Sequence, residues 1–77
     1  MKRKYSYEDI SNRQIEEAIS DWIHNEVDRR ILRKKLIDGK SYSQICDDLY
    51  REDKTELTER QIQNRMYKAE DILFKHI

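Results

Sequence analysis

Helix-start signals of one form, Ser/Thr-x-x-Gln, constrain the fold of this chain more than any other feature. They begin at Ser11, Ser41 and Thr58. The hydroxyl at the first position and the glutamine three residues later can both bond the backbone amides that are unpaired at a helix N-terminus. Asn25 with Asp28 has the same spacing and related side chains. The sequence therefore predicts an all-α fold, a small domain of four helices.

Apolar residues follow each start at helical spacing, which places them on one face of the helix. The predicted helices cover residues 12–24, 26–38, Ser41 to Tyr50, and Thr58 to His76. Trp22, the largest apolar side chain of the first helix, is expected to anchor the core. Gly39 suits a left-handed C-cap. The charged segment 51–56 is predicted to be a loop, although its composition also permits one more helical turn.

Length and composition indicate one compact unit, because the chain has 77 residues, no proline and one glycine. We expect a basic, flexible arm over residues 1–10 and a single helical domain over 11–77. No segment approaches the roughly 20 apolar residues of a membrane span, and the N-terminus lacks the apolar stretch of a signal peptide. The lone Cys46 fits a reducing compartment. We therefore expect a cytoplasmic protein.

The formal net charge is zero, but the charges are arranged in blocks along the chain. Residues 8–28 hold seven acids and one base, whereas residues 29–40 hold six bases and one acid. A polarised surface is typical of DNA-binding domains. Such blocks also occur on ordinary solvated helices, so charge alone leaves both interpretations open.

The order of the last two helices predicts a helix-turn-helix. In this motif a short helix crosses the DNA backbone and the next helix enters the major groove. The sequence places a short helix after Ser41 and a longer helix with a polar first turn after Thr58. We therefore expect a DNA-binding transcription regulator.

A family resemblance supports this interpretation over residues 28–73. The run Asp38-Gly39-Lys40-Ser41-Tyr42-Ser43-Gln44-Ile45, followed by a helix from Thr58 with Arg65 seven residues on, resembles region 4 of sigma-70-type transcription factors. It is also similar to short phage-encoded regulators that carry this domain alone. The resemblance implies binding to a promoter-like DNA duplex, with RNA polymerase as a further candidate partner. The connection before Thr58 is longer and more charged than the tight turn of that family.

The polar face of the last helix supplies the predicted base contacts. Arginine can donate two bonds to guanine, glutamine and asparagine can pair with adenine, and glutamate can accept from cytosine. The predicted base contacts are Glu59, Arg60, Gln61, Gln63 and Asn64. A polar helix face without any ligand is the structural alternative.

Basic and helix-start residues supply the predicted phosphate contacts, which set register on the duplex rather than sequence preference. They are Arg33, Lys34, Lys40, Ser41, Arg65 and Lys68. For Arg33 and Lys34, and for the neighbouring Arg29 and Arg30, pairing with acids of the first helix is an equal alternative.

A protein-interaction module that docks on RNA polymerase or another regulator, without DNA contact, is the second function considered. Tyr67, Phe74 and Ile77 lie off the main apolar stripe of the last helix and could serve a partner or a homodimer. His24 and His76 lack ligand-spaced companions, so no metal and no cofactor are expected. Cys46 lies on an apolar stripe and is interpreted as core rather than nucleophile. We expect no enzymatic activity.

Overall fold

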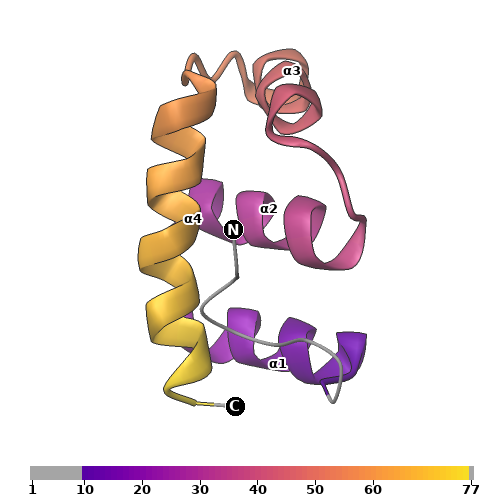
Figure 1. Cartoon of the computed structure of the whole chain (residues 1–77), viewed down its shortest axis with the longest axis vertical. Coiled ribbons are helices and arrows are strands. Elements are labelled where there is room, and N and C mark those ends of the chain that lie inside the picture. The colour runs from indigo at the N-terminus through magenta and orange to yellow at the C-terminus, as the bar shows by residue number, and fades with distance from the viewer. Residues whose placement is uncertain (1–9, 77) are drawn as a thin grey trace.

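The computed structural model describes residues 10–76, which form four α-helices and one π-helical segment, with no strand in this range (Figure 1). The elements are α1 (Asn12–Trp22), α2 (Glu26–Leu32), the π-helical η1 (Arg33–Ile37), α3 (Tyr42–Asp53) and α4 (Glu59–Phe74). The predicted all-α fold with four helices is confirmed. The predicted basic arm lies outside the described residues except for Ile10, which packs against the core.

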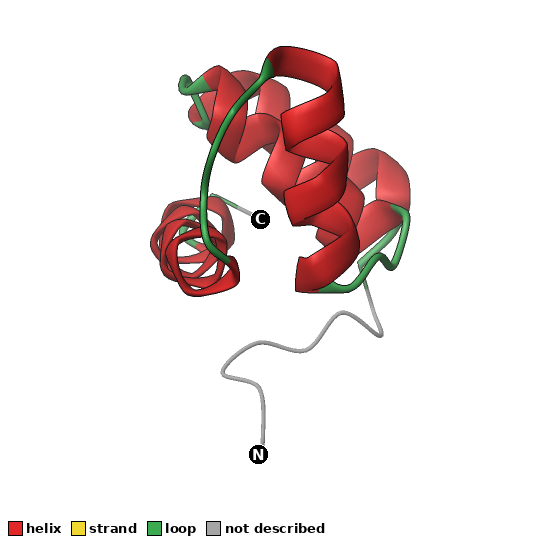
Figure 2. Ribbon diagram, turned by 90° about the horizontal axis from the view of Figure 1, so that it is seen from above, coloured by secondary structure: helices red, strands yellow, loops and turns green. Residues whose placement is uncertain are grey.

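Helix α4 runs the length of the molecule, and α1, α2 and α3 are stacked against one side of it (Figure 1). Figure 2, which looks approximately along α4, shows the other helices to one side of it. The opposite side of α4 is therefore not covered by another described helix.

The four predicted helix starts are all confirmed. At α1, the Gln14 amide donates to Ser11 Oγ (3.2 Å) and the Ser11 amide donates to Gln14 Oε1 (2.9 Å), which completes a capping box. The same reciprocal pairs form between Ser41 and Gln44 at α3 and between Thr58 and Gln61 at α4. At α2, Asn25 Oδ1 accepts from the amides of Val27 and Asp28. The sequence signals act locally, as the spacing predicts.

The core is formed by apolar side chains from every α-helix. Its buried members are Ile15, Ala18, Ile19, Ile23, Ile31, Leu32, Ile45, Leu49, Ile62, Met66, Ala69 and Leu73. Leu36, Ile37 and Leu57 are half-buried against it. The stripe predicted for the last helix, Ile62, Met66, Ala69 and Leu73, is wholly buried.

The prediction that Trp22 anchors the core is wrong. Trp22 remains 45% exposed, whereas Ile19 and Ile23 are buried. The indole stacks instead on the imidazole of His76, with ring centroids 3.6 Å apart and an angle of 8° between the planes. Because α1 ends at Trp22, the next apolar residue, Ile23, closes the interior and leaves the larger ring at the edge.

Helix boundaries differ from the predictions in four places. Helix α1 ends at Trp22 rather than at residue 24, and α4 ends at Phe74 rather than at His76. The predicted helix 26–38 is α-helical only to Leu32 and continues as η1, where the Asp38 amide donates to the Arg33 carbonyl five residues earlier (3.1 Å). Gly39 then takes the expected left-handed conformation, with φ of 70°.

The fourth difference is the length of α3, which continues to Asp53 rather than ending by Tyr50. Part of the charged segment predicted as a loop therefore forms the additional helical turn that its composition permits. Lys54 ends the helix in the left-handed region, with φ of 59°, and its amide donates to the carbonyls of Leu49 and Tyr50. The connection to α4 is thereby reduced to residues 54–58.

Candidate nucleic-acid interface

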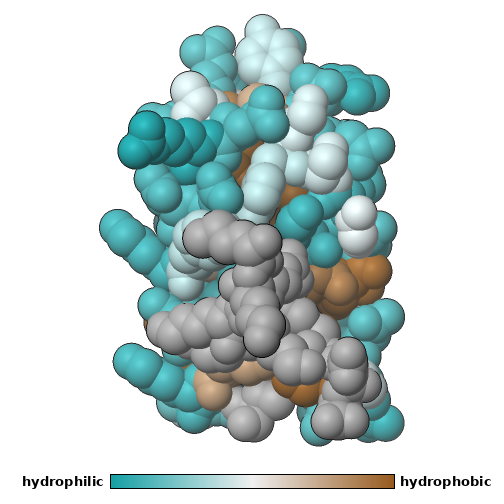
Figure 3. All heavy atoms as spheres, in the orientation of Figure 1, coloured by the Kyte–Doolittle hydropathy of each residue, from teal (hydrophilic) through white to brown (hydrophobic). Residues whose placement is uncertain are grey.

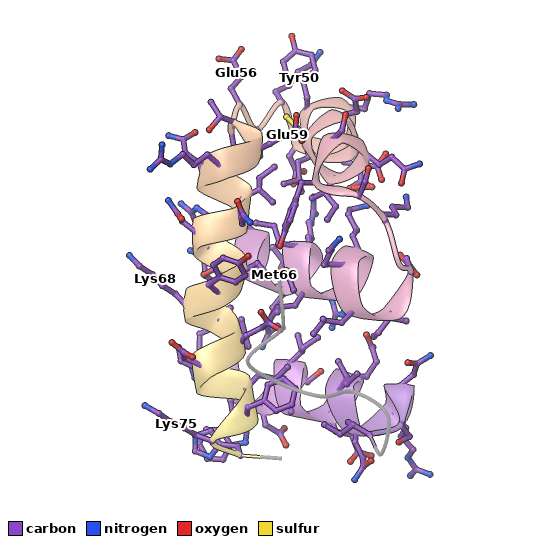
Figure 4. All side chains as sticks on the ribbon, in the orientation of Figure 1. Tyr50, Glu56, Glu59, Met66, Lys68 and Lys75 are labelled. Carbon is purple, nitrogen blue, oxygen red and sulfur yellow. The ribbon has the colours of Figure 1, made fainter. Side chains whose placement is uncertain are left out.

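The outer face of α4 carries a stripe of exposed polar side chains. Arg60, Asn64, Tyr67 and Lys68 are all exposed and are spaced at i, i+4, i+7 and i+8, which puts them on one side of the helix. Figure 4 shows Lys68 and Lys75 pointing away from the other helices, whereas Met66 lies on the side of the interior. We call the stripe of Arg60, Asn64, Tyr67 and Lys68 the outer face of α4.

The five predicted base contacts do not share one environment. Glu59, Arg60, Gln61 and Asn64 are exposed, and Gln63 is half-buried. Gln61 Oε1 accepts a bond from the Thr58 amide (2.9 Å), so a paired contact with adenine would open the capping box. Gln63 Nε2 donates to the Tyr67 hydroxyl (2.8 Å). Within residues 10–76, Arg60 and Asn64 have no such partner and keep both bonding positions free.

Most of the predicted phosphate contacts form ion pairs inside the protein. Arg33 pairs with Glu16 of α1 (3.1 Å), as the structural alternative anticipated. Lys34 pairs instead with α3, at Glu52 (3.1 Å) and Asp48 (3.5 Å). The alternative of pairing with the first helix is therefore confirmed for Arg33 and wrong for Lys34.

The remaining predicted phosphate contacts lie in the connection before α3 and on α4. Lys40 pairs with Asp48 (2.5 Å), and Arg65 pairs with Asp28 of α2 (3.1 Å). Ser41 caps α3 through its hydroxyl. Lys68 has no carboxylate partner in the described part of the chain. It is the one predicted phosphate-contacting cation of this range that needs no ion pair to be broken.

Arg29 and Arg30 also have partners in the structure, but not acids of α1. Arg30 pairs with Glu26 on its own helix and with Asp53 of α3. Arg29 donates to the backbone carbonyls of Ser20 (2.9 Å) and Ile23, at the C-terminal end of α1. Since carbonyl oxygens at a helix C-terminus lack helical partners, Arg29 acts as a cap contributed by the next helix. No sequence pattern indicated this contact.

Asp48 is the centre of the α3 ion pairs, with Lys34 and Lys40 both within 3.5 Å. The hydrogen bond from Lys40 lowers the pKa of Asp48, and the same bond raises the pKa of Lys40. A carboxylate whose pKa is lowered on folding stabilises the native state above its unfolded-state pKa, and this contribution is lost as the pH falls through the folded-state pKa.

Lys40→Ala is accordingly expected to lower stability in a pH-dependent way. The difference in unfolding free energy from the unmodified chain should be largest near pH 6 and should shrink as the pH falls below about 4. Asp48 of the unfolded chain takes up a proton first, and the contribution is lost as the pH falls further, through the lowered pKa of Asp48 in the folded chain. Urea denaturation followed by circular dichroism at several pH values measures it. Lys75→Ala, which removes an exposed lysine outside these pairs, is the control. An equal loss at neutral and acidic pH would contradict the linkage.

A groove of about 700 Å³ lies where α3 turns into α4, between the ends of the two helices. Its lining includes Cys46, Tyr50, Leu57 and Gln61. Cys46 Sγ donates to the Leu57 carbonyl (2.9 Å), which ties the turn to α3 and gives the thiol a structural contact. In the described range, no three His, Cys, Asp or Glu side chains are grouped in a way that could hold a metal ion.

Hydrophilic residues cover most of the surface in the view of Figure 3, and hydrophobic residues appear there in small areas. Across residues 10–76, no helix is both long enough and apolar enough to cross a bilayer. On the face that Figure 3 shows, the described residues present a largely polar surface. Residues 10–76 form a small all-α domain of four helices. No protein-family model, curated protein or solved structure matches this chain.

Proposed function

We propose that the protein is a DNA-binding transcription regulator in which α3 and α4 act as a helix-turn-helix. The observation that carries the proposal is the outer face of α4, which lies opposite the other helices and offers Arg60, Asn64 and Lys68 without hydrogen-bond or ion-pair partners among residues 10–76. A major groove about 12 Å wide admits an α-helix. The proposal places α4 in that groove and involves no catalytic step and no cofactor.

The placement of α3 supports this proposal. Its buried residues Ile45 and Leu49 join the same core as Ile62 of α4, and the Cys46 to Leu57 bond holds the connection between the helices. This gives α3 and α4 a defined relative orientation in spite of the charged residues around Lys54. A fixed first helix that lies across the DNA backbone is what a helix-turn-helix requires.

The ion pairs of Arg33, Lys40 and Arg65 are compatible with phosphate contacts. Exposed ion pairs contribute only about 0–1 kcal/mol each, so a phosphate can compete for these three cations. The Lys34 side chain is only 12% exposed and is held by two carboxylates, so its phosphate contact is not part of the proposal. The proposed contacts therefore comprise Lys68 and Ser41 directly and the three exposed paired cations by exchange of partners. The proposal includes the cytoplasmic localisation expected from the sequence.

Selection from a pool of random duplexes tests the proposal, with affinities then measured at about 50 and 200 mM salt. We expect an enriched sequence and an affinity that falls with salt. Lys68→Ala should weaken binding to all duplexes and reduce the salt slope by about one phosphate contact, because it removes a backbone contact. Arg13→Ala, an exposed change on α1, should leave the slope unchanged. Absence of binding at the lower salt concentration would overturn the proposal.

A protein-interaction module is the second candidate, favoured by apolar side chains that remain exposed. Trp22 is 45% exposed, Tyr67 50% and Ile72 43%. Phe74, which the sequence pattern groups with Tyr67 and Ile77 as a candidate partner surface, packs against the core. Ile77 lies outside the described residues. A stable complex with purified RNA polymerase, together with no DNA affinity, would favour this candidate. Sedimentation equilibrium of the chain alone would test the homodimer.

A further inference from the structure

We infer that the DNA target presents a guanine and an adenine in its major groove, about two base-pair steps apart, read by Arg60 and Asn64. This inference rests on the proposed function and adds the bases that the interface would select. The side chains of Gln61 and Gln63 suit base edges equally well by chemistry, but both already take part in hydrogen bonds, Gln61 with the amide of the N-cap Thr58 and Gln63 with the Tyr67 hydroxyl. Their existing bonds set them apart from Arg60 and Asn64.

Paired recognition of a base requires the two polar groups of a side chain to be aimed together at the base edge, and an internal hydrogen bond aims one of them elsewhere. Adenine offers N7 as acceptor and its N6 amino group as donor, so an amide reader must present its oxygen and its nitrogen together. Gln61 has its oxygen on the Thr58 amide, and Gln63 has its nitrogen on the Tyr67 hydroxyl. Asn64 has neither group engaged within the described residues. It is therefore the amide on α4 that can pair with adenine without breaking a hydrogen bond within the described residues.

Arg60 is the corresponding reader for guanine. Guanine presents two acceptors, O6 and N7, that match two N–H groups of a guanidinium. Arg65, the other arginine on α4, is held by Asp28 at 3.1 Å, whereas Arg60 is exposed with no carboxylate partner in residues 10–76. A free guanidinium in the first turn of α4 can reach base edges when the N-terminal end of this helix lies deepest in the groove.

The separation of the two readers sets the spacing of the two bases. Four residues of α-helix advance about 6 Å along the axis, and stacked bases are spaced by about 3.4 Å along a strand. Arg60 and Asn64 therefore span about two base-pair steps. Tyr67 and Lys68 follow on the next turn, where a hydroxyl oriented by Gln63 and an ammonium group are suited to the phosphate backbone.

The experiment uses the duplex enriched by selection with the full chain. Each guanine and each adenine is replaced singly by its 7-deaza analogue, which lacks the N7 acceptor, and binding is measured by fluorescence anisotropy. One guanine and one adenine should each lose about 2- to 12-fold in affinity, half the free energy of a paired contact. We call these affinity losses the guanine penalty and the adenine penalty. Arg60→Ala should abolish the guanine penalty and keep the adenine penalty, and Asn64→Ala should abolish the adenine penalty and keep the guanine penalty. Each variant should itself lose about 5- to 150-fold on the selected duplex.

Matched control variants distinguish a loss of base recognition from misfolding and from a failure of the proposed function. Arg13→Ala and Asn12→Ala make the same chemical changes at exposed sites on α1 and should keep both penalties. Circular dichroism should show intact helices in all four variants, because Arg60 and Asn64 are exposed and make no side-chain hydrogen bond or ion pair within residues 10–76. Suppose that the chain selects a duplex but the affinity losses caused by the 7-deaza bases disappear in Gln61→Ala or Gln63→Ala, or persist in every variant. The inference is then overturned and the proposed function stands. If no duplex is bound, both are overturned.

Discussion

Replacing Ile19 by alanine is expected to lower the free energy of unfolding by about 2–5 kcal/mol, the range for removing a large aliphatic side chain from a core. Ile19 is fully buried, and its helix packs against α4, η1 and α2. The cavity left by the substitution therefore lies where several elements meet. A domain of this size has a total stability of roughly 4–12 kcal/mol, so the variant should be partly unfolded at moderate temperature. Urea denaturation followed by circular dichroism measures the loss.

Trp22→Ala provides the comparison, because it removes a larger side chain from the same helix. Trp22 is 45% exposed, and its specific ring contact is the stack on His76. An aromatic pair contributes about 0.5–1.5 kcal/mol beyond the area that it buries. We expect Trp22→Ala to lower the free energy of unfolding clearly less than Ile19→Ala does. The opposite order would mean that the indole is buried in the core, as the sequence pattern alone suggested.

Arg29→Ala is expected to cost about 1–3 kcal/mol, which is unusually large for an arginine outside the core. The guanidinium donates to two carbonyl oxygens, of Ser20 and Ile23, where α1 ends. Hydrogen bonds from a charged donor contribute more than neutral ones, and a cation near a helix C-terminus is also favoured by the helix dipole. The substitution removes both effects. Thermal and urea unfolding of the variant measure the change.

Arg13→Ala is the matched control for this prediction. Its side chain is 88% exposed, and it pairs with Glu17 one turn later on the same helix. Such pairs contribute about 0.2–0.5 kcal/mol, so this variant should be nearly as stable as the unmodified chain. Arg29→Lys keeps the charge but loses the planar guanidinium that reaches two acceptors. Its free energy of unfolding should lie between those of Arg29→Ala and Arg13→Ala. Equal stability of Arg29→Ala and Arg13→Ala would exclude the capping role.

Local sequence signals predicted the parts of the fold that depend on neighbouring residues. A capping box joins side chains three residues apart, so Ser11, Ser41 and Thr58 could be recognised without knowledge of the rest of the chain. Helical periodicity likewise identified the buried stripe of the last helix. Boundaries were predicted less well, because η1 and the last turn of α3 depend on packing between elements and on Lys54 adopting a left-handed conformation.

The candidate interface was predicted only in outline. The polar face of α4 follows from periodicity and the helix-start signal singles out Gln61, but the other polar side chains of this face appear equivalent in the sequence. The structure distinguishes them by their partners, since Gln61 and Gln63 are bonded along the helix while Arg60 and Asn64 are not. The pairing of Arg65 with Asp28 joins residues on different helices, and no local pattern could have revealed it.

The chain's own sequence thus specifies where its helices begin and which faces are apolar, because both depend on interactions over three or four residues. Tertiary packing decides which apolar residue fills the centre, which cations are neutralised and which polar side chains remain free. Ile19 rather than Trp22 occupies the interior, and Lys34 pairs with α3 rather than α1. The physical reason is that burial and charge pairing depend on which helices meet, and those contacts join residues far apart in the sequence.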